Sequence, residues 1–280
     1  MTETNKLEHW VAILTRADLP VLKQTARDLA TLRADVKNLN AYSITEVITR
    51  DPIMTVKLLR YLQQHKGKAQ TTEVVQVEQA LLMLGVELFF NKVAPQPLVE
   101  EVLKDHITAL APMLRVVHRA HRASEYAKEW AVMLRDLHYE DVCVAALLHD
   151  IAETLMWCFA PDMMLKIRDL QQQDKAQRSH TIQEQVLGFT LDELQKKLAV
   201  NWGLPQLLLM LMNDSSTKEP RVRNVELAIN LARHSANGWD DAALPDDYQA
   251  IGELLHMSAT EVMHMVATED ETASDINKPH

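Results

Sequence analysis

The sequence has few of the residues that form turns and hairpins. It contains 6 glycines in 280 residues, and runs that alternate apolar and polar residues, as strands do, are hard to find. Leu, Ala, Met, Gln and Glu, which favour helices, are frequent instead. The composition therefore excludes a β-rich fold and predicts an all-α protein built as a multi-helix bundle.

Features of exported and membrane proteins are also scarce. The chain has 2 cysteines, Cys143 and Cys158, which we expect to be reduced thiols rather than a structural disulfide. The opening residues MTETNKLEHW show neither a basic start nor an apolar core, and the apolar runs fall short of the length of a membrane span. We therefore expect a cytoplasmic protein without a membrane partner.

An excess of basic residues is missing as well. Lys and Arg number 29 against 39 Asp and Glu, which gives a net charge of -10. A net negative charge repels polyanions on average, so nucleic acid is not expected as a partner. A local basic patch can still bind phosphate.

Helical periodicity is what the sequence does have, over most of its length. Apolar residues recur at helical spacing in the segments 21–32, 53–62, 74–84, 107–134, 142–156, 191–200, 204–212, 222–236 and 259–266. Asp51 precedes Pro52 as an N-cap precedes a first helical turn, and Pro205 restarts a helix after Gly203. These signals agree with the all-α prediction.

The distribution of the segments predicts two helical units and a tail. We expect an N-terminal helical subdomain over residues 1–105 and a second helical bundle, which contains the adjacent His149 and Asp150, over residues 106–267. The last residues, 268–280, are acidic and polar, which is typical of a disordered tail. No low-complexity linker separates the two units.

One polar pair interrupts an apolar segment. The stretch AALLHDIAETLMW, residues 145–157, carries His149 and Asp150 side by side. Imidazole and carboxylate together suit a divalent transition metal, and adjacent helical side chains reach one ion only at a helix edge. Upstream, His118 and His121 share one helix face. His121, His149 and Asp150 are therefore candidate metal ligands.

Three arginines surround these upstream histidines. Arg115, Arg119 and Arg122 share part of the same helix surface. Guanidinium groups beside an imidazole hold phosphate or carboxylate well, so Arg115, His118 and Arg122 form a candidate anion site. The alternative is a solvated basic face paired with neighbouring acids such as Glu125.

These motifs together resemble a known family. A histidine about thirty residues before ALLHDIA resembles the H…HD pattern of the HD superfamily of metal-dependent phosphohydrolases. The wider sequence resembles one branch, the HDOD (HD-related output) domains of bacterial signalling proteins. The matching segments, in the family's order, are Leu19-Pro20, TRDPIMTVKLLRYL, VEQALLMLGVELFF, AALLHDIAETLMW and NWGLPQLLLMLM. The resemblance implies an HD-like helical bundle.

The resemblance also implies a ligand set that this chain does not have. In the superfamily a first histidine, the HD pair and a later aspartate hold metals that activate water against a phosphate ester. Here Arg233 occupies the position of the later aspartate, and arginine does not ligate metals. Two further histidine positions are Leu191 and Asn213. The metal site is therefore incomplete.

Two functions remain open from the sequence. The favoured one is a non-catalytic signalling module of HDOD type that binds signalling proteins or a small ligand and needs no cofactor. The alternative is a phosphohydrolase acting on a nucleotide or cyclic dinucleotide with iron, manganese or zinc, in which Glu153 or Asp214 replaces the lost aspartate. We favour the first because too few ligands remain.

The favoured reading makes His149 and Asp150 a structural pair. A buried carboxylate without a partner costs several kcal/mol, so Asp150 needs a cation or a hydrogen-bond donor close by. The sequence offers His121 and Arg122 as such partners.

Overall fold

The computed structural model describes residues 3–65, 76–174, 177–212 and 219–276. Within these ranges the chain is helical, and the β pairing is one isolated parallel bridge between Val21 and Leu98. The all-α prediction is therefore confirmed. The helices are α1 (Glu3–Arg16), α2 (Lys23–Ala34), α3 (Ala41–Ile48), α4 (Pro52–Gln64), α5 (Val77–Leu84), α6 (Val86–Lys92), α7 (Val99–Val102), α8 (Ile107–Met133), α9 (Tyr139–Leu148), α10 (Ile151–Phe159), α11 (Pro161–Gln173), α12 (Ser179–Leu187), α13 (Leu191–Trp202), α14 (Gln206–Leu211), α15 (Pro220–His234), the 3-10 turn η2 (Ser235–Asn237), α16 (Leu244–Leu255) and α17 (Ala259–Ile276).

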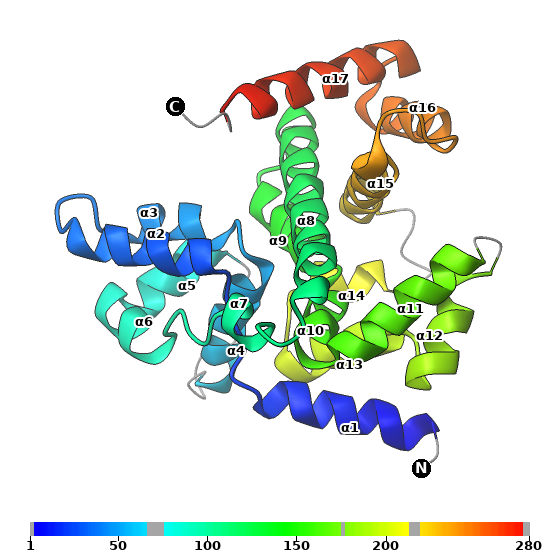
Figure 1. The fold of residues 1–280 in the computed structure, drawn as a ribbon. Coiled ribbons are helices and arrows are strands. Elements are labelled where there is room, and N and C mark those ends of the chain that lie inside the picture. The colour runs from blue at the N-terminus through cyan, green and yellow to red at the C-terminus, as the bar shows by residue number, and fades with distance from the viewer. Residues whose placement is uncertain (1–2, 66–75, 175–176, 213–218, 277–280) are drawn as a thin grey trace.

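The long helix α8 is the centre of the fold. In Figure 1, α2 to α7 lie to one side of α8, α11 and α12 lie to the other side, and α17 lies at its C-terminal end. Helices α9, α10 and α15 pack directly against α8. Small side chains such as Ala120, Ala123 and Ala127 on its buried face allow the neighbouring helices to approach closely.

One hydrophobic core runs through both halves of the chain. Phe89 of α6, Trp130 of α8 and Leu198 of α13 are buried members of it. Helix α4 packs on α8, α9, α10 and α13, and α1 packs on α13. The break between α7 and α8 falls where the boundary near residue 105 is expected, but the shared core leaves the division into residues 1–105 and 106–267 a prediction.

The C-terminal helix extends beyond its predicted end. Helix α17 continues to Ile276, so it enters the segment 268–280 that was expected to be a tail. There is no proline or glycine between residues 259 and 276 to end the helix earlier. Residues 277–280 lie outside the described residues.

The two cysteines are free thiols. Cys158 is buried and Cys143 is partly buried. Burial raises the pKa of the Cys143 thiol to about 12 and raises that of Cys158 as well. Both side chains are therefore un-ionised at neutral pH and pack as small apolar groups.

One described segment, Tyr139–Phe159, is long and apolar enough to cross a membrane. The expectation that every apolar run is too short is therefore wrong for this segment. Its most apolar window has a mean hydropathy of 1.5, but 72% of that window is buried inside the protein. The segment comprises α9 and α10, which are core helices, and the cytoplasmic location stays a prediction.

The segment 142–156, predicted as one helix, is broken at the polar pair. Helix α9 ends at Leu148 and α10 begins at Ile151, so His149 and Asp150 form the junction. Asp150 leaves the helical conformation, with φ -100° and ψ 25°. The prediction of a continuous helix is wrong. Every residue here is compatible with a helix, so the sequence gives no local sign of a break, and the break is stabilised by residues distant in the chain.

A buried glutamine from α13 bridges this break. The Gln195 side chain donates from Nε2 to the Leu148 carbonyl oxygen at 2.9 Å and accepts at Oε1 from the Ala152 backbone N–H at 2.8 Å. It therefore satisfies one backbone group on each side of the junction. The bridge fixes the position of the His149–Asp150 pair relative to α13.

Arg60 in α4 holds the C-terminal end of α1. Its guanidinium donates to the carbonyl oxygens of Leu14 at 3.0 Å, Thr15 at 3.4 Å and Ala17 at 2.9 Å. It also lies over the Trp202 ring, 5.4 Å from the centroid. The last carbonyls of a helix have no partners within the helix, so this buried arginine satisfies them.

Replacing Arg60 with methionine is expected to lower the free energy of unfolding by about 2–3 kcal/mol. Methionine fills most of the volume but donates no hydrogen bond, so the carbonyl oxygens at the end of α1 lose their partner. Urea unfolding followed by tryptophan fluorescence measures the loss. The control is Arg27→Met at an exposed position of α2, and an equal loss in both variants would contradict the assignment.

Candidate functional site

The His149–Asp150 pair lines a cleft of about 510 Å³. Its walls come from α8, α10, α11, α12 and α13, and α15 contributes one residue, Arg233. The charged side chains that line it are Arg115, Arg119, Arg168, Arg233, Asp150, Glu153 and Asp192, with His149 and His180. The cleft therefore gathers four arginines and three carboxylates around the predicted pair.

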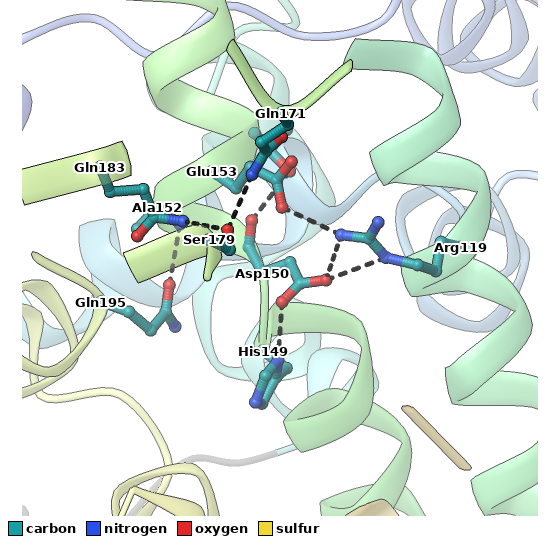
Figure 2. A network of polar contacts seen from close by, with 10 residues as sticks. Arg119, His149, Asp150, Ala152, Glu153, Gln171, Ser179, Gln183 and Gln195 are labelled. Carbon is teal, nitrogen blue, oxygen red and sulfur yellow. Dashed lines mark hydrogen bonds and ion pairs between the residues drawn. The ribbon is translucent and has the colours of Figure 1, made fainter. Parts of the chain in front are cut away.

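Arg119 is the partner of the Asp150 carboxylate (Figure 2). Its Nη2 lies 2.7 Å and its Nε 3.2 Å from Asp150 Oδ2, and the same Nη2 lies 2.9 Å from Glu153 Oε2. On the other side, His149 Nδ1 lies 2.7 Å from Asp150 Oδ1. One guanidinium thus bridges two carboxylates, and Asp150 has a partner on each oxygen.

The charges of this network stabilise one another. Burial opposes ionisation of Asp150, but the charges and hydrogen bonds of His149 and Arg119 outweigh it and hold its pKa well below the usual range. Burial raises the pKa of Glu153, and the nearby Asp150 charge adds to this effect against the lowering by Arg119. Burial also disfavours the charged Arg119, yet the two carboxylates raise its pKa overall. Arg119 is therefore a permanent cation at the centre of the pair.

The sequence-based choice of partner for Asp150 is wrong. His121 lies against Glu125 one turn along α8, with Nδ1 3.4 Å from Oε2. The Arg122 guanidinium lies over the rings of Tyr126 and Trp239, 5.4 and 5.7 Å from their centroids. Arg122 lies three residues from Arg119 and shares its face of α8, so spacing alone does not select between the two arginines, whereas His121 is only two residues away and lies on another face.

The structure brings some of the other predicted site residues into the cleft and places others outside it. Arg115, Leu191 and Arg233 line the cleft together with His149 and Asp150. His118 is exposed on α8 and, like His121 and Arg122, is not among the residues that line the cleft. The predicted anion group of Arg115, His118 and Arg122 therefore does not converge on this cleft.

Two predicted positions lie outside the described residues. These are Asn213, in a family histidine position, and Asp214, a candidate substitute ligand. Leu191 is buried, and its backbone N–H donates to Gln183 Oε1 at 2.9 Å. An apolar side chain thus lies at the position where the resemblance expects a histidine.

Several site residues were not predicted from the sequence. Arg119 was recognised as one of three arginines but not as the partner of Asp150, although its separation of four residues from Arg115 places both on one face of α8. Gln195 and the α11–α12 residues Gln171, Ser179 and Gln183 gave no sequence signal. Figure 2 shows the Gln171 and Gln183 amides directed at the Ser179 hydroxyl, at 2.8 and 3.1 Å.

The donor groups present do not fit the metal site that the HD pattern implies. Within the described part of the chain, no group of three or more His, Cys, Asp and Glu residues is placed to hold a metal ion. His149 Nδ1 and both Asp150 oxygens are engaged, and Glu153 already bonds Arg119. A metal at Asp150 would have to displace a guanidinium and remain beside its charge.

Comparisons with known proteins place the fold. The HDOD domain family matches residues 19–217. The MmoQ response regulator from Methylococcus capsulatus str. Bath has 15% identity and a TM-score of 0.64, over 89% of this chain and 98% of its own. A virulence factor from Campylobacter jejuni subsp. jejuni has 17% identity and a TM-score of 0.62, over 95% and 92%. Among curated proteins, none matches the chain.

The family match covers the motifs that surround the cleft and leaves out Arg233, which comes from α15 beyond residue 217. It includes the Asp51-Pro52 helix start, the His149–Asp150 junction and the Gln195 bridge. The two solved structures share the fold at low identity. The chain belongs to the HDOD domain family.

Proposed function

We propose that this chain is a non-catalytic signalling module of HDOD type, in which Arg119 takes the place of a metal between Asp150 and Glu153. The observation that carries the proposal is the Arg119 guanidinium, bonded to Asp150 at 2.7 Å and to Glu153 at 2.9 Å. A hydrolytic metal centre needs free carboxylate oxygens and open coordination positions. Here the carboxylates neutralise a side chain of the protein itself.

The replaced ligand positions support the same proposal. Arg233 lines the cleft where the family pattern has an aspartate, and Leu191 presents an apolar side chain where it has a histidine. Each change removes a donor, and Arg233 also adds a positive charge that repels a divalent cation. Both changes therefore disfavour the binding of a metal ion in this cleft.

The signalling role is supported by the family and by its relatives. HDOD stands for HD-related output domain, a type of domain found in bacterial signalling proteins. One solved structure with the same fold is described as a response regulator. We propose that this chain binds signalling proteins or a small ligand in the cytoplasm. Binding would change how the helices pack around α8.

Purified protein is expected to carry no stoichiometric transition metal, because Arg119 already satisfies Asp150 and Glu153. Elemental mass spectrometry on untagged protein purified without chelator measures iron, manganese and zinc per chain. Hydrolysis of bis-p-nitrophenyl phosphate with each metal added is expected to match that of the His149→Ala variant.

The variant separates the proposal from its alternative. Near-stoichiometric metal or metal-dependent turnover that His149→Ala abolishes would overturn the proposal and establish a phosphohydrolase. Equal background values in both proteins support a structural His149–Asp150 pair.

A further inference from the structure

The cleft keeps basic side chains that the protein itself does not neutralise. Arg119 is matched by Asp150 and Glu153, which leaves Asp192 as the remaining carboxylate among the lining residues. Arg168 contacts Asp169 at 3.1 Å. In the described part of the chain, the side chains of Arg115 and Arg233 make no hydrogen bond or ion pair. Two guanidinium groups from α8 and α15 thus line one cleft with their donors unused.

The four arginines of the lining exceed its three carboxylates by one, in a protein with a net charge of -10. Unpaired charges of one sign in a cleft attract ions of the opposite sign, and here the unpaired side chains are Arg115 and Arg233. Guanidinium groups pair with phosphate oxygens through two parallel hydrogen bonds, and a phosphate monoester near neutral pH carries close to two negative charges. Two separate arginines therefore suit a phosphate dianion better than a single carboxylate.

The remainder of the lining is apolar and uncharged polar. Trp157, Met164 and Ile167 are buried residues of the wall formed by α10 and α11. Ser179 and Gln183 of α12 add a hydroxyl and an amide. A volume of about 510 Å³ lies in the range of small-molecule sites, which combine apolar walls with a few polar groups.

We infer that this cleft binds a small organic phosphate, with the phosphate at Arg115 and Arg233 and the apolar body against Trp157 and Ile167, and that it does not hydrolyse it. The inference rests on the proposed function, because the two carboxylates Asp150 and Glu153 must stay bonded to Arg119 and leave Arg115 and Arg233 to the anion. The loss of a family aspartate at Arg233 then has a second consequence: it exchanges a metal ligand for an anion ligand.

Isothermal titration with phenyl phosphate tests the inference on the full chain. Phenyl phosphate combines a dianion with an apolar ring, inorganic phosphate lacks the ring, and benzoate carries a single carboxylate. Phenyl phosphate is expected to bind at least several-fold more tightly than either. Arg115→Gln and Arg233→Gln are each expected to weaken binding at least about tenfold, because each removes charge-assisted hydrogen bonds.

Arg223→Gln is the matched control, since Arg223 lies on the same helix as Arg233 but pairs with Glu253 at 3.0 Å outside the cleft. It is expected to bind like the wild type. Thermal unfolding confirms that the variants fold, which is expected because Arg115 and Arg233 have no partner to lose.

The inference would be overturned, and the proposed function left standing, by any of three results: no binding of phenyl phosphate, wild-type affinity in the Arg115→Gln and Arg233→Gln variants, or tighter binding of benzoate. Release of phenol from bound phenyl phosphate would instead overturn the proposed function. Binding without turnover, lost in both arginine variants, supports both.

Discussion

Replacing Arg119 with methionine is expected to destabilise the protein by about 3 kcal/mol, the lower end of the cost of removing one partner from a buried ion pair, because the three side chains are partly buried. Methionine retains the aliphatic volume but leaves Asp150 and Glu153 facing each other without a cation. Asp150 is 17% exposed and Glu153 27%, so water does little to replace the guanidinium. Urea unfolding followed by tryptophan fluorescence at pH 7 measures the change.

Neutralising the two carboxylates tests the cause of this loss. The triple variant Arg119→Met, Asp150→Asn, Glu153→Gln removes the uncompensated charges, so it is expected to recover most of the lost stability. Arg223→Met is the control for losing an exposed pair, with an expected cost of no more than about 1 kcal/mol. If Arg119→Met costs no more than this control, Arg119 does not hold the pair as described.

The sequence predicts the helical framework better than it predicts the site. Asp51-Pro52 and Gly203 are local signals whose physics acts within one turn, and the structure places a helix start and a helix end at them. The break at His149 and Asp150 carries no local signal, because it depends on Gln195, which lies more than forty residues away in the chain.

The cleft contains some of the predicted site residues but not others, such as His118, His121 and Arg122, and the pairing of Asp150 is not the predicted one. Leu191 and Arg233, which the resemblance assigns to altered ligand positions, both line the cleft. The choice of Arg119 over its neighbours depends on how α8 is rotated against α10, and that rotation is set by packing along the whole helix. Arg122 lies three residues from Arg119 and shares its face, so helical spacing does not decide between these two arginines, whereas His121, two residues from Arg119, lies on another face.

Replacing Asp51 with alanine is expected to lower the free energy of unfolding by about 3–4 kcal/mol, by losing a helix cap and leaving buried donors without partners. Asp51 is fully buried. Its Oδ1 accepts from the backbone N–H groups of Ile53 at 2.9 Å and Met54 at 3.0 Å, and its Oδ2 accepts from Leu22 at 2.9 Å. One carboxylate thus caps α4 and fixes the chain that enters α2.

The helix cap and the long-range hydrogen bond to Leu22 make separate contributions to the effect of losing Asp51. Asn40 caps α3 in an exposed position, where its side chain accepts from the Ser43 backbone N–H at 2.9 Å. Asn40→Ala is therefore expected to cost only about 1 kcal/mol, as for an ordinary cap. Asp51→Asn keeps one carbonyl oxygen and is expected to fall between Asp51→Ala and Asn40→Ala. Equal losses for Asp51→Ala and Asn40→Ala in chemical unfolding would show that the Leu22 contact contributes nothing. A larger loss for Asp51→Ala assigns the Asp-Pro motif a structural role, because it joins segments about thirty residues apart through one buried carboxylate.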